Sequence, residues 1–225
     1  MPAIASRYEA VRRQVADAAD CVDRDPSDVL IVAVTKTHGV ESIRKALEAG
    51  VCDFGENRVQ EFLGKYGLFP TANWHFIGTL QTNKAKDVVG RACLIHSVDS
   101  IKLLAEIDRR ATAAGVVQPV LLEVNVSGEA SKHGFLAEDV REALIEASRM
   151  SGLHVRGLMT MAPFGRPKDA RWVFRELREL RDSLREMPLN GVELVELSMG
   201  MSNDFRVAVE EGATIVRVGG AIFGR

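Results

Sequence analysis

Short apolar runs alternate with longer stretches of helical spacing along almost the whole chain. The runs are rich in Val and Ile and are bounded by small or polar residues, which is typical of buried β-strands. Eight such runs occur, at residues 29–35, 52–54, 74–77, 93–96, 119–126, 153–160, 193–197 and 214–218. Several are continuously apolar rather than alternating, and this favours a parallel sheet covered by helices.

Amphipathic helices are predicted between these strands. The clearest covers residues 168–187, where Val and Leu recur on one helical face and Arg and Glu fill the other faces. Residues 99–113 and 137–149 show the same pattern, and an initial helix is predicted at about 3–20. Strand and helix therefore alternate from one end of the chain to the other.

Eight strand–helix repeats favour a closed (β/α)₈ TIM barrel, in the α/β class, over an open doubly wound sheet. A length of 225 residues suits one minimal barrel, and no proline-rich linker or low-complexity tract indicates a second domain. We expect one domain over residues 1–225. Because the chain ends directly after the eighth strand, the helix at about 3–20 is expected to cover the place of a last helix.

Composition and charge exclude several classes of function. Lys and Arg number 29 against 31 Asp and Glu, so the basic surface that nucleic-acid binding needs is missing. No apolar run approaches the roughly 20 residues of a membrane span, and the N-terminus lacks the apolar block of a signal peptide. The three cysteines are widely spaced, and no metal-ligand or nucleotide-hydrolysis motif occurs. We therefore expect a cytoplasmic protein without a metal and without nucleic-acid or membrane partners.

Glycines and hydroxyls follow the seventh and eighth strands, in LSMGMSNDF at 197–205 and RVGGAIFG at 217–224. Barrels of this class often hold phosphate in these two loops. Backbone amides that glycine leaves accessible favour an anion, so we expect a phosphate-bearing ligand beside Ser202, Gly219 and Gly220. The alternative is that Ser202 caps a helix and the glycines only permit a tight turn.

Two cations are predicted at the same end of the barrel. Lys36 ends the first apolar run on the face expected to point inward, and burial favours the neutral amine that attacks an aldehyde to form a Schiff base. Arg217 lies on the adjacent eighth strand and stays cationic, since guanidinium keeps its proton. Repulsion between the two cations would favour the neutral form of Lys36 further. The alternatives are a lysine that reaches water and an arginine paired with Glu123 or Glu196.

Three other positions close to the predicted rim are candidates. Asn57 in FGENRVQE is a candidate cofactor-binding residue, and His75 and Gly78 lie in WHFIGTLQTNK. Asn57 could equally cap a helix, and His75 could be a core residue. Lys132, in the predicted loop GEASKHG, is a second amine, for which we favour an exposed, solvated side chain.

Five blocks, AVTKT, FGENRVQE, WHFIGTLQTNK, LSMGMSNDF and VRVGGAIFG, follow one another in order. Together they resemble the pyridoxal phosphate homeostasis protein family, from about residue 29 to the C-terminus. The resemblance implies a barrel similar to the N-terminal domain of alanine racemase, of fold-type III, with pyridoxal 5′-phosphate (PLP) as cofactor. It further implies a protein that holds PLP reversibly, buffers it, hands it to apo-enzymes as recipients and influences amino-acid and keto-acid balance.

The same resemblance assigns roles at the site. Lys36 becomes the Schiff-base lysine, Ser202 and the amides of Gly219 and Gly220 become the phosphate cradle, and Arg217 faces the pyridine nitrogen. His38 departs from the pattern, because many family members have a second lysine there. A role that requires two amines on the first strand is therefore not expected.

The resemblance favours a carrier over an enzyme. A cation beside the ring nitrogen disfavours its protonation and weakens the ring as an electron sink. Racemases of similar fold add a tyrosine base, whereas the tyrosines here, Tyr8 and Tyr66, lie in no matching motif. We expect no catalytic residues and a monomer or weak homodimer. The alternatives are a PLP-dependent racemase or decarboxylase, and a Schiff-base aldolase, whose lysine usually lies on the sixth strand, where GLMTMAP has none.

Overall fold

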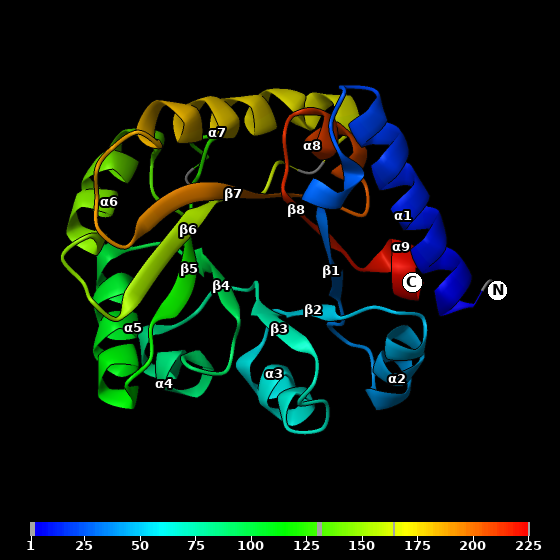
Figure 1. The fold of residues 1–225 in the computed structure, drawn as a ribbon, viewed down its shortest axis with the longest axis horizontal. Helices are drawn as coiled ribbons and strands as arrows, with labels where there is room; N and C mark the ends of the chain where they lie inside the picture. Colours follow the sequence, from blue (N-terminus) through cyan, green and yellow to red (C-terminus); the bar gives the residue numbers. More distant parts are fainter. Residues whose placement is uncertain (1–2, 130–131, 164, 225) are drawn as a thin grey trace.

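The structure, a computed structural model, describes residues 3–129, 132–163 and 165–224. Eight parallel strands follow one another around a closed barrel in chain order, and the last pairs with the first (Figure 1). The strands are β1 Leu30–Val34, β2 Asp53–Glu56, β3 Asn73–Phe76, β4 Leu94–Val98, β5 Gln118–Glu123, β6 Leu153–Met159, β7 Val192–Met201 and β8 Ile215–Val218. The predicted (β/α)₈ barrel is confirmed.

Each of the eight predicted strands is present, with ends that differ by a few residues. The largest difference is in β7, which continues from the predicted end at 197 to Met201 because Ser198 and Gly200 remain buried in the barrel wall. β5 instead ends at Glu123, before the predicted end at 126. There the chain leaves the ladder and forms an isolated bridge between Val124 and Phe135.

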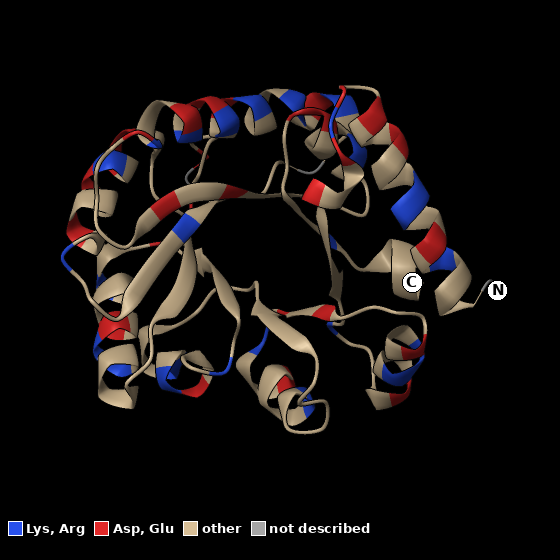
Figure 2. Ribbon diagram, viewed as in Figure 1, with Lys and Arg blue, Asp and Glu red and all other residues tan. Residues whose placement is uncertain are grey.

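Helices cover the outside of the barrel, and most charged residues lie on them and on the loops (Figure 2). The α-helices are α1 Ile4–Asp20, α2 Val40–Glu48, α3 Val59–Tyr66, α4 Ala85–Val88, α5 Ile101–Ala114, α6 Val140–Ala147, α7 Arg171–Leu184, α8 Phe205–Glu210 and α9 Gly220–Phe223. Short 3₁₀ turns are η1 Pro26–Asp28, η2 Thr82–Lys84, η3 Ala137–Asp139 and η4 Pro167–Ala170. The helices predicted at 99–113, 137–149 and 168–187 correspond to α5, to η3 with α6, and to η4 with α7.

Helix α1 lies where a helix after β8 would cover the barrel (Figure 1). Its buried apolar face packs against α8 and α9. Arg7 of α1 donates hydrogen bonds to the carbonyl oxygens of Ile222, at 2.6 Å, and Phe223, at 3.0 Å. The first helix is thereby tied to the last, as the sequence predicts.

The interior of the barrel contains both apolar and polar side chains. One small apolar cluster comes from five strands and consists of Val32, Leu94, Leu121, Met159 and Ile215. Beside it, four polar side chains are at most 4% exposed: His75, His96, Ser198 and Arg217. Branched apolar residues usually fill such a barrel, whereas these four polar side chains are hydrogen-bonded to one another.

Several features bear on the classes of function that the sequence excluded. In the described part of the chain, no helix is long and apolar enough to cross a membrane. Cys21, Cys52 and Cys93 are all free thiols. Among the described residues, no group of three or more His, Cys, Asp or Glu side chains is placed to hold a metal ion.

Candidate functional site

A cavity of about 720 Å³ opens at the C-terminal ends of the strands. Each residue predicted to bind the cofactor lines it, namely Lys36, Asn57, Ser202, Arg217, Gly219 and Gly220. These residues follow or belong to β1, β2, β7 and β8, whose C-terminal ends meet at one rim because all the strands are parallel. The fold therefore brings together residues that lie far apart in the sequence.

Lys36 lies two residues beyond the end of β1 and is exposed at the cavity. Of the two interpretations left open for Lys36, the structure agrees with the lysine that reaches water, because β1 ends before this residue. The next residue, Thr37, has φ of 67°, which is an unfavourable conformation for a β-branched residue. Its amide donates to Glu61 Oε2 at 3.0 Å and its hydroxyl to the Lys36 carbonyl at 2.5 Å, and these bonds hold the turn.

A buried ion pair lies next to this turn and was not predicted. Lys65 Nζ on α3 donates to Glu56 Oε1 at 2.5 Å and to the Thr35 carbonyl at 2.8 Å. Both side chains are almost completely buried. The pair fixes the end of β1 against β2. A lysine in the last turn of a short helix gives no sequence signal for such burial, because lysines there usually reach solvent.

Asn57 directly follows β2 and lines the cavity. Its buried Oδ1 has no hydrogen-bond partner in the described structure. The alternative role as a helix cap is not found, since α3 has Arg58 at its N-cap position and no side-chain cap bond. A side chain at Gly78 would place its Cβ 2.2 Å from the Asn57 carbonyl oxygen, so glycine there lets the loops after β2 and β3 meet. Asn57 thus offers an unused acceptor at a fixed position.

The loops after β7 and β8 meet at Ser202. Its Oγ accepts hydrogen bonds from the amides of Gly219, at 3.1 Å, and Ala221, at 3.3 Å. Ser202 does not cap the helix that follows it, because α8 begins after Asp204 and has no side-chain cap bond, and its bond from Ala221 lies instead at the start of α9. A Cβ at Gly220 would meet only Ser202 Oγ, 4.0 Å away, so the missing side chain leaves open space at this corner of the cavity.

Arg217 is 4% exposed and reaches the cavity from inside the barrel. Its Nη1 donates to Ser198 Oγ at 2.6 Å and its Nη2 to the Thr160 carbonyl at 2.9 Å. The alternative ion pair with Glu123 or Glu196 is not formed, since neither carboxylate is among its partners. Burial lowers the pKa of Arg217 to about 10, against the effect of nearby carboxylates, so the guanidinium is cationic at neutral pH.

Both the sequence and the fold of this chain are similar to those of known proteins. The family model for the alanine racemase N-terminal domain matches residues 7–225. A pyridoxal phosphate homeostasis protein of Aquifex aeolicus is 44% identical over 97% of this chain and 96% of that protein. The protein of the same name from Escherichia coli is 32% identical over 98% of this chain and 96% of its own length. This chain belongs to the pyridoxal phosphate homeostasis protein family.

Solved structures place this member of the homeostasis family among related barrels. PipY of Synechococcus elongatus PCC7942 with PLP bound has a TM-score of 0.85 and 36% identity, covering 98% of this chain and 100% of that one. A protein of Bifidobacterium adolescentis has a TM-score of 0.92 and 36% identity, covering 98% of this chain and 94% of that one. Alanine racemase of Clostridium difficile 630, at 16% identity and a TM-score of 0.73 over 95% of this chain and 59% of its own, shares the fold.

Two further candidate residues of this homeostasis-family member, His75 and Lys132, lie in different surroundings. His75 lies inside the barrel in a hydrogen bond to His96, so its interpretation as a core residue is confirmed. Lys132 is half-buried and lines the same cavity as Lys36, so its interpretation as an exposed loop residue is wrong. The cavity therefore has two lysines, from loops on different strands.

Proposed function

We propose that this protein binds PLP in the cavity at the C-terminal ends of the strands and acts as a carrier in PLP homeostasis. The convergence of Lys36, Asn57, Ser202 and Arg217 in one cavity is the observation that carries the proposal. PLP, when bound, supplies an aldehyde that reacts reversibly with a primary amine. The names and the bound cofactor of the relatives described above support the same assignment.

The residues present fit the chemical groups of this cofactor. The amine of Lys36 is accessible in the cavity and would bind the aldehyde. Ser202 Oγ accepts from the amides of Gly219 and Ala221, so its hydroxyl hydrogen would donate to a phosphate, and the space beside Gly220 leaves room for it. The unused acceptor of Asn57 suits a hydroxyl group of a ligand.

Arg217 determines what kind of chemistry the site supports. Two of its five N–H bonds are held by Ser198 and Thr160, and the others can donate toward the cavity. A buried cation that keeps its proton would leave a pyridine nitrogen unprotonated. Arg217 would therefore orient the ring while limiting its capacity to stabilise a carbanion.

We also infer that the protein is a carrier rather than a racemase. A racemase needs a second base opposite the lysine, and in related barrels this is a tyrosine. Tyr8 instead lines a cavity at the N-terminal ends of the strands, and Tyr66 packs against Phe62 on α3. The exposure of Lys36 favours release of a bound aldehyde to an acceptor protein.

Equilibrium titration with PLP tests this proposal directly. Lys36→Ala is expected to abolish the absorption of the protein-bound cofactor, whereas Lys132→Ala retains it, and Lys45→Ala, on the surface of α2, serves as the control for loss of one lysine. Holo protein mixed with an apo-PLP enzyme is expected to restore that enzyme's activity. Hydrogen exchange at Cα of amino acids in deuterated water would instead support the racemase alternative.

We infer that residues 1–225 form one domain, and that the protein is cytoplasmic and either a monomer or a weak homodimer. Analytical ultracentrifugation over a range of protein concentrations measures the last property. A stable higher oligomer at all concentrations would contradict it.

A further inference from the structure

A row of hydrogen-bonded polar side chains crosses the interior of the barrel. His75 Nε2 lies 3.1 Å from Asp53 Oδ1, and His75 Nδ1 lies 2.9 Å from His96 Nε2. His96 Nδ1 lies 2.8 Å from Ser198 Oγ, which accepts from Arg217 Nη1 at 2.6 Å. Four strands besides β8 contribute to this row, which we call the interior chain.

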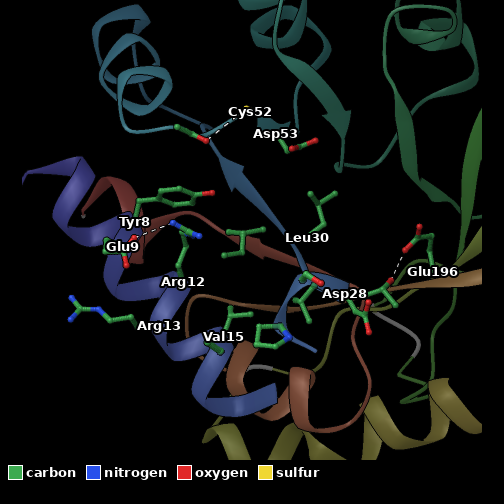
Figure 3. Close-up of a pocket in the computed structure, with 17 residues that line it drawn as sticks. Tyr8, Glu9, Arg12, Arg13, Val15, Asp28, Leu30, Cys52, Asp53 and Glu196 are labelled. Carbon is green, nitrogen blue, oxygen red and sulfur yellow. Dashed lines mark hydrogen bonds and ion pairs between the residues drawn. The ribbon is translucent and has the colours of Figure 1, made fainter. Parts of the chain in front are cut away.

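The interior chain joins the two ends of the barrel. Asp53 is the first residue of β2 and lines a second cavity of about 650 Å³, between α1 and the N-terminal ends of the strands (Figure 3). Arg217 lines the first cavity, at the opposite ends of the strands. The three side chains between them are at most 3% exposed.

Burial on this scale is tolerated only when the polar groups satisfy one another. Among the described residues, the buried side-chain atoms without a hydrogen-bond partner are Glu56 Oε2 and Asn57 Oδ1, neither of which belongs to the interior chain. Each link must therefore have one donor and one acceptor, and this condition fixes where the hydrogens lie.

Arg217, at one end of the interior chain, can only donate hydrogen bonds. Ser198 Oγ accepts its hydrogen, and the Ser198 hydroxyl then donates to Nδ1 of His96. His96 carries its hydrogen on Nε2 and donates to Nδ1 of His75, which in turn donates from Nε2 to the Asp53 carboxylate. Every hydrogen bond runs in one direction, with both histidines neutral, from a cation at one end to an anion at the other.

The opposite direction leaves two groups in unfavourable states. His96 would donate from Nδ1 to Ser198 Oγ, so the Ser198 hydroxyl hydrogen would lack an acceptor. Asp53 would have to be protonated in order to donate to His75. An imidazolium at either histidine would likewise require a hydrogen on Nδ1 of His96, facing Ser198 Oγ, and would again leave the Ser198 hydroxyl hydrogen without an acceptor. Burial, with smaller contributions from His75 and Arg217, holds the pKa of His96 well below its usual value, in agreement with a neutral ring.

We propose that His75, His96 and Ser198 are positioning residues that hold the guanidinium of Arg217 in place at the floor of the cofactor cavity, and that the interior chain couples Asp53 at the far end to that cavity. This inference rests on the proposed PLP function for its effect on the cofactor. The arrangement of hydrogens itself is a property of the protein without cofactor. Ser198 Oγ is one of two acceptors for Arg217, with the Thr160 carbonyl, so we expect the guanidinium to be held less firmly when Ser198 or its link to His96 is lost.

Nitrogen-15 NMR of the histidine rings in the cofactor-free protein at pH 7 tests the direction of the chain. We expect both His75 and His96 to be neutral with the hydrogen on Nε2. A hydrogen on Nδ1 of His96, or an imidazolium at either position, would overturn the inference. This measurement needs no cofactor, so it is decided separately from whether the protein binds PLP.

Variants test the coupling to the cavity. Ser198→Ala is expected to weaken PLP binding about tenfold and to shift the absorption maximum of the bound cofactor, because Arg217 loses an acceptor. Ser198→Thr, which keeps the hydroxyl, should restore both properties. Met159→Leu, in the adjacent apolar cluster, is the packing control and should leave Kd within about twofold.

Asp53→Asn addresses the far end of the chain. It keeps an acceptor for His75 and removes the charge, so we expect a change of about threefold in PLP affinity although Asp53 lies outside the cofactor cavity. Unchanged affinity and an unchanged spectrum in both Ser198→Ala and Asp53→Asn would overturn the coupling. If Ser198→Ala does not fold, Asp53→Asn and the NMR measurement still decide the question.

Discussion

At the scale of single residues, two serines accept hydrogen bonds from backbone amides in different places. Ser202 Oγ accepts from Gly219 and Ala221 at the cavity, whereas Ser100 Oγ accepts from Leu103 at the start of α5. Ser202→Ala is expected to weaken PLP binding about tenfold through lost contacts to a charged phosphate. Ser100→Ala is the control and should cost about 1 kcal/mol of stability without changing affinity. Titration and urea unfolding of both variants measure this, and equal losses of affinity would contradict it.

The neutral state of His96 predicts a dependence of stability on pH. Its pKa in the folded protein lies well below the usual value because of burial, His75 and Arg217, whereas in the unfolded chain the ring titrates near its model value of 6.5. As pH falls below that value the unfolded chain binds the extra proton, so the stability that a neutral His96 supplies at pH 7 is progressively lost.

Urea unfolding between pH 7 and pH 5 tests this dependence. We expect the loss of stability per pH unit to be smaller in His96→Gln than in wild type, by up to about 1.4 kcal/mol, because glutamine does not titrate. Comparison of the two proteins removes the contributions of all other groups. Parallel pH profiles would show that His96 titrates alike in the folded and unfolded states.

The six residues that the sequence motifs predicted to bind the cofactor all lie at one site, because parallel strands bring their C-terminal ends together. They are Lys36, Asn57, Ser202, Arg217, Gly219 and Gly220. Neither Lys132 nor the buried Lys65 could be placed in this way. Their positions depend on how a loop and a short helix pack in three dimensions, and a lone lysine has the same local pattern whether it is exposed or buried. The pairing of His75 with His96 likewise follows only from closure of the barrel.

At the scale of elements, an ion cluster connects α7 to the end of α8. Arg171, Arg175 and Arg178 all donate to the carboxylate of Glu211, at 2.9, 3.1 and 3.2 Å. Burial alone would raise the pKa of Glu211, but the hydrogen bonds from the arginines outweigh it and lower that pKa. The cluster therefore stabilises the fold at neutral pH, and its contribution is lost as pH falls through the lowered pKa.

Glu211→Gln is expected to cost about 1–3 kcal/mol of stability, because three half-exposed guanidinium groups lose a buried counter-charge. Glu146→Gln, in an exposed pair on α6, is the control and should change stability by less than about 1 kcal/mol. Urea unfolding at pH 7 measures both. A Glu211 variant as stable as the control would mean that the cluster contributes nothing.

The accuracy of the predicted elements follows from the length of their patterns. Long amphipathic helices such as α5 and α7 show several turns of apolar spacing, and the strands show runs of β-branched residues, so both were predicted. α4 and α9 have only four residues each, too few to display a helical period. The strand ends at Lys36 and Met201 depend on pairing with neighbouring strands, which the sequence does not display.

At the scale of the whole molecule, α1 closes the outer ring of helices and its bonds from Arg7 reach the last residues of the barrel. We therefore expect the chain to unfold as one cooperative unit, in agreement with the inference of a single domain. Trp74 in β3 is 1% exposed and reports on the core, whereas Trp172 on α7 is 48% exposed. In Trp172→Phe, fluorescence of Trp74 and far-ultraviolet circular dichroism should give the same urea midpoint. Two separate midpoints would indicate parts that unfold independently.

Two lysines, Lys36 and Lys132, line the cavity, and only one of them is expected to hold the cofactor. Borohydride reduction of the PLP-loaded protein, followed by mass mapping of its peptides, measures this directly. We expect the added mass on the peptide that contains Lys36. Added mass on the peptide of Lys132 instead, or no added mass on any lysine, would contradict the assignment of the site.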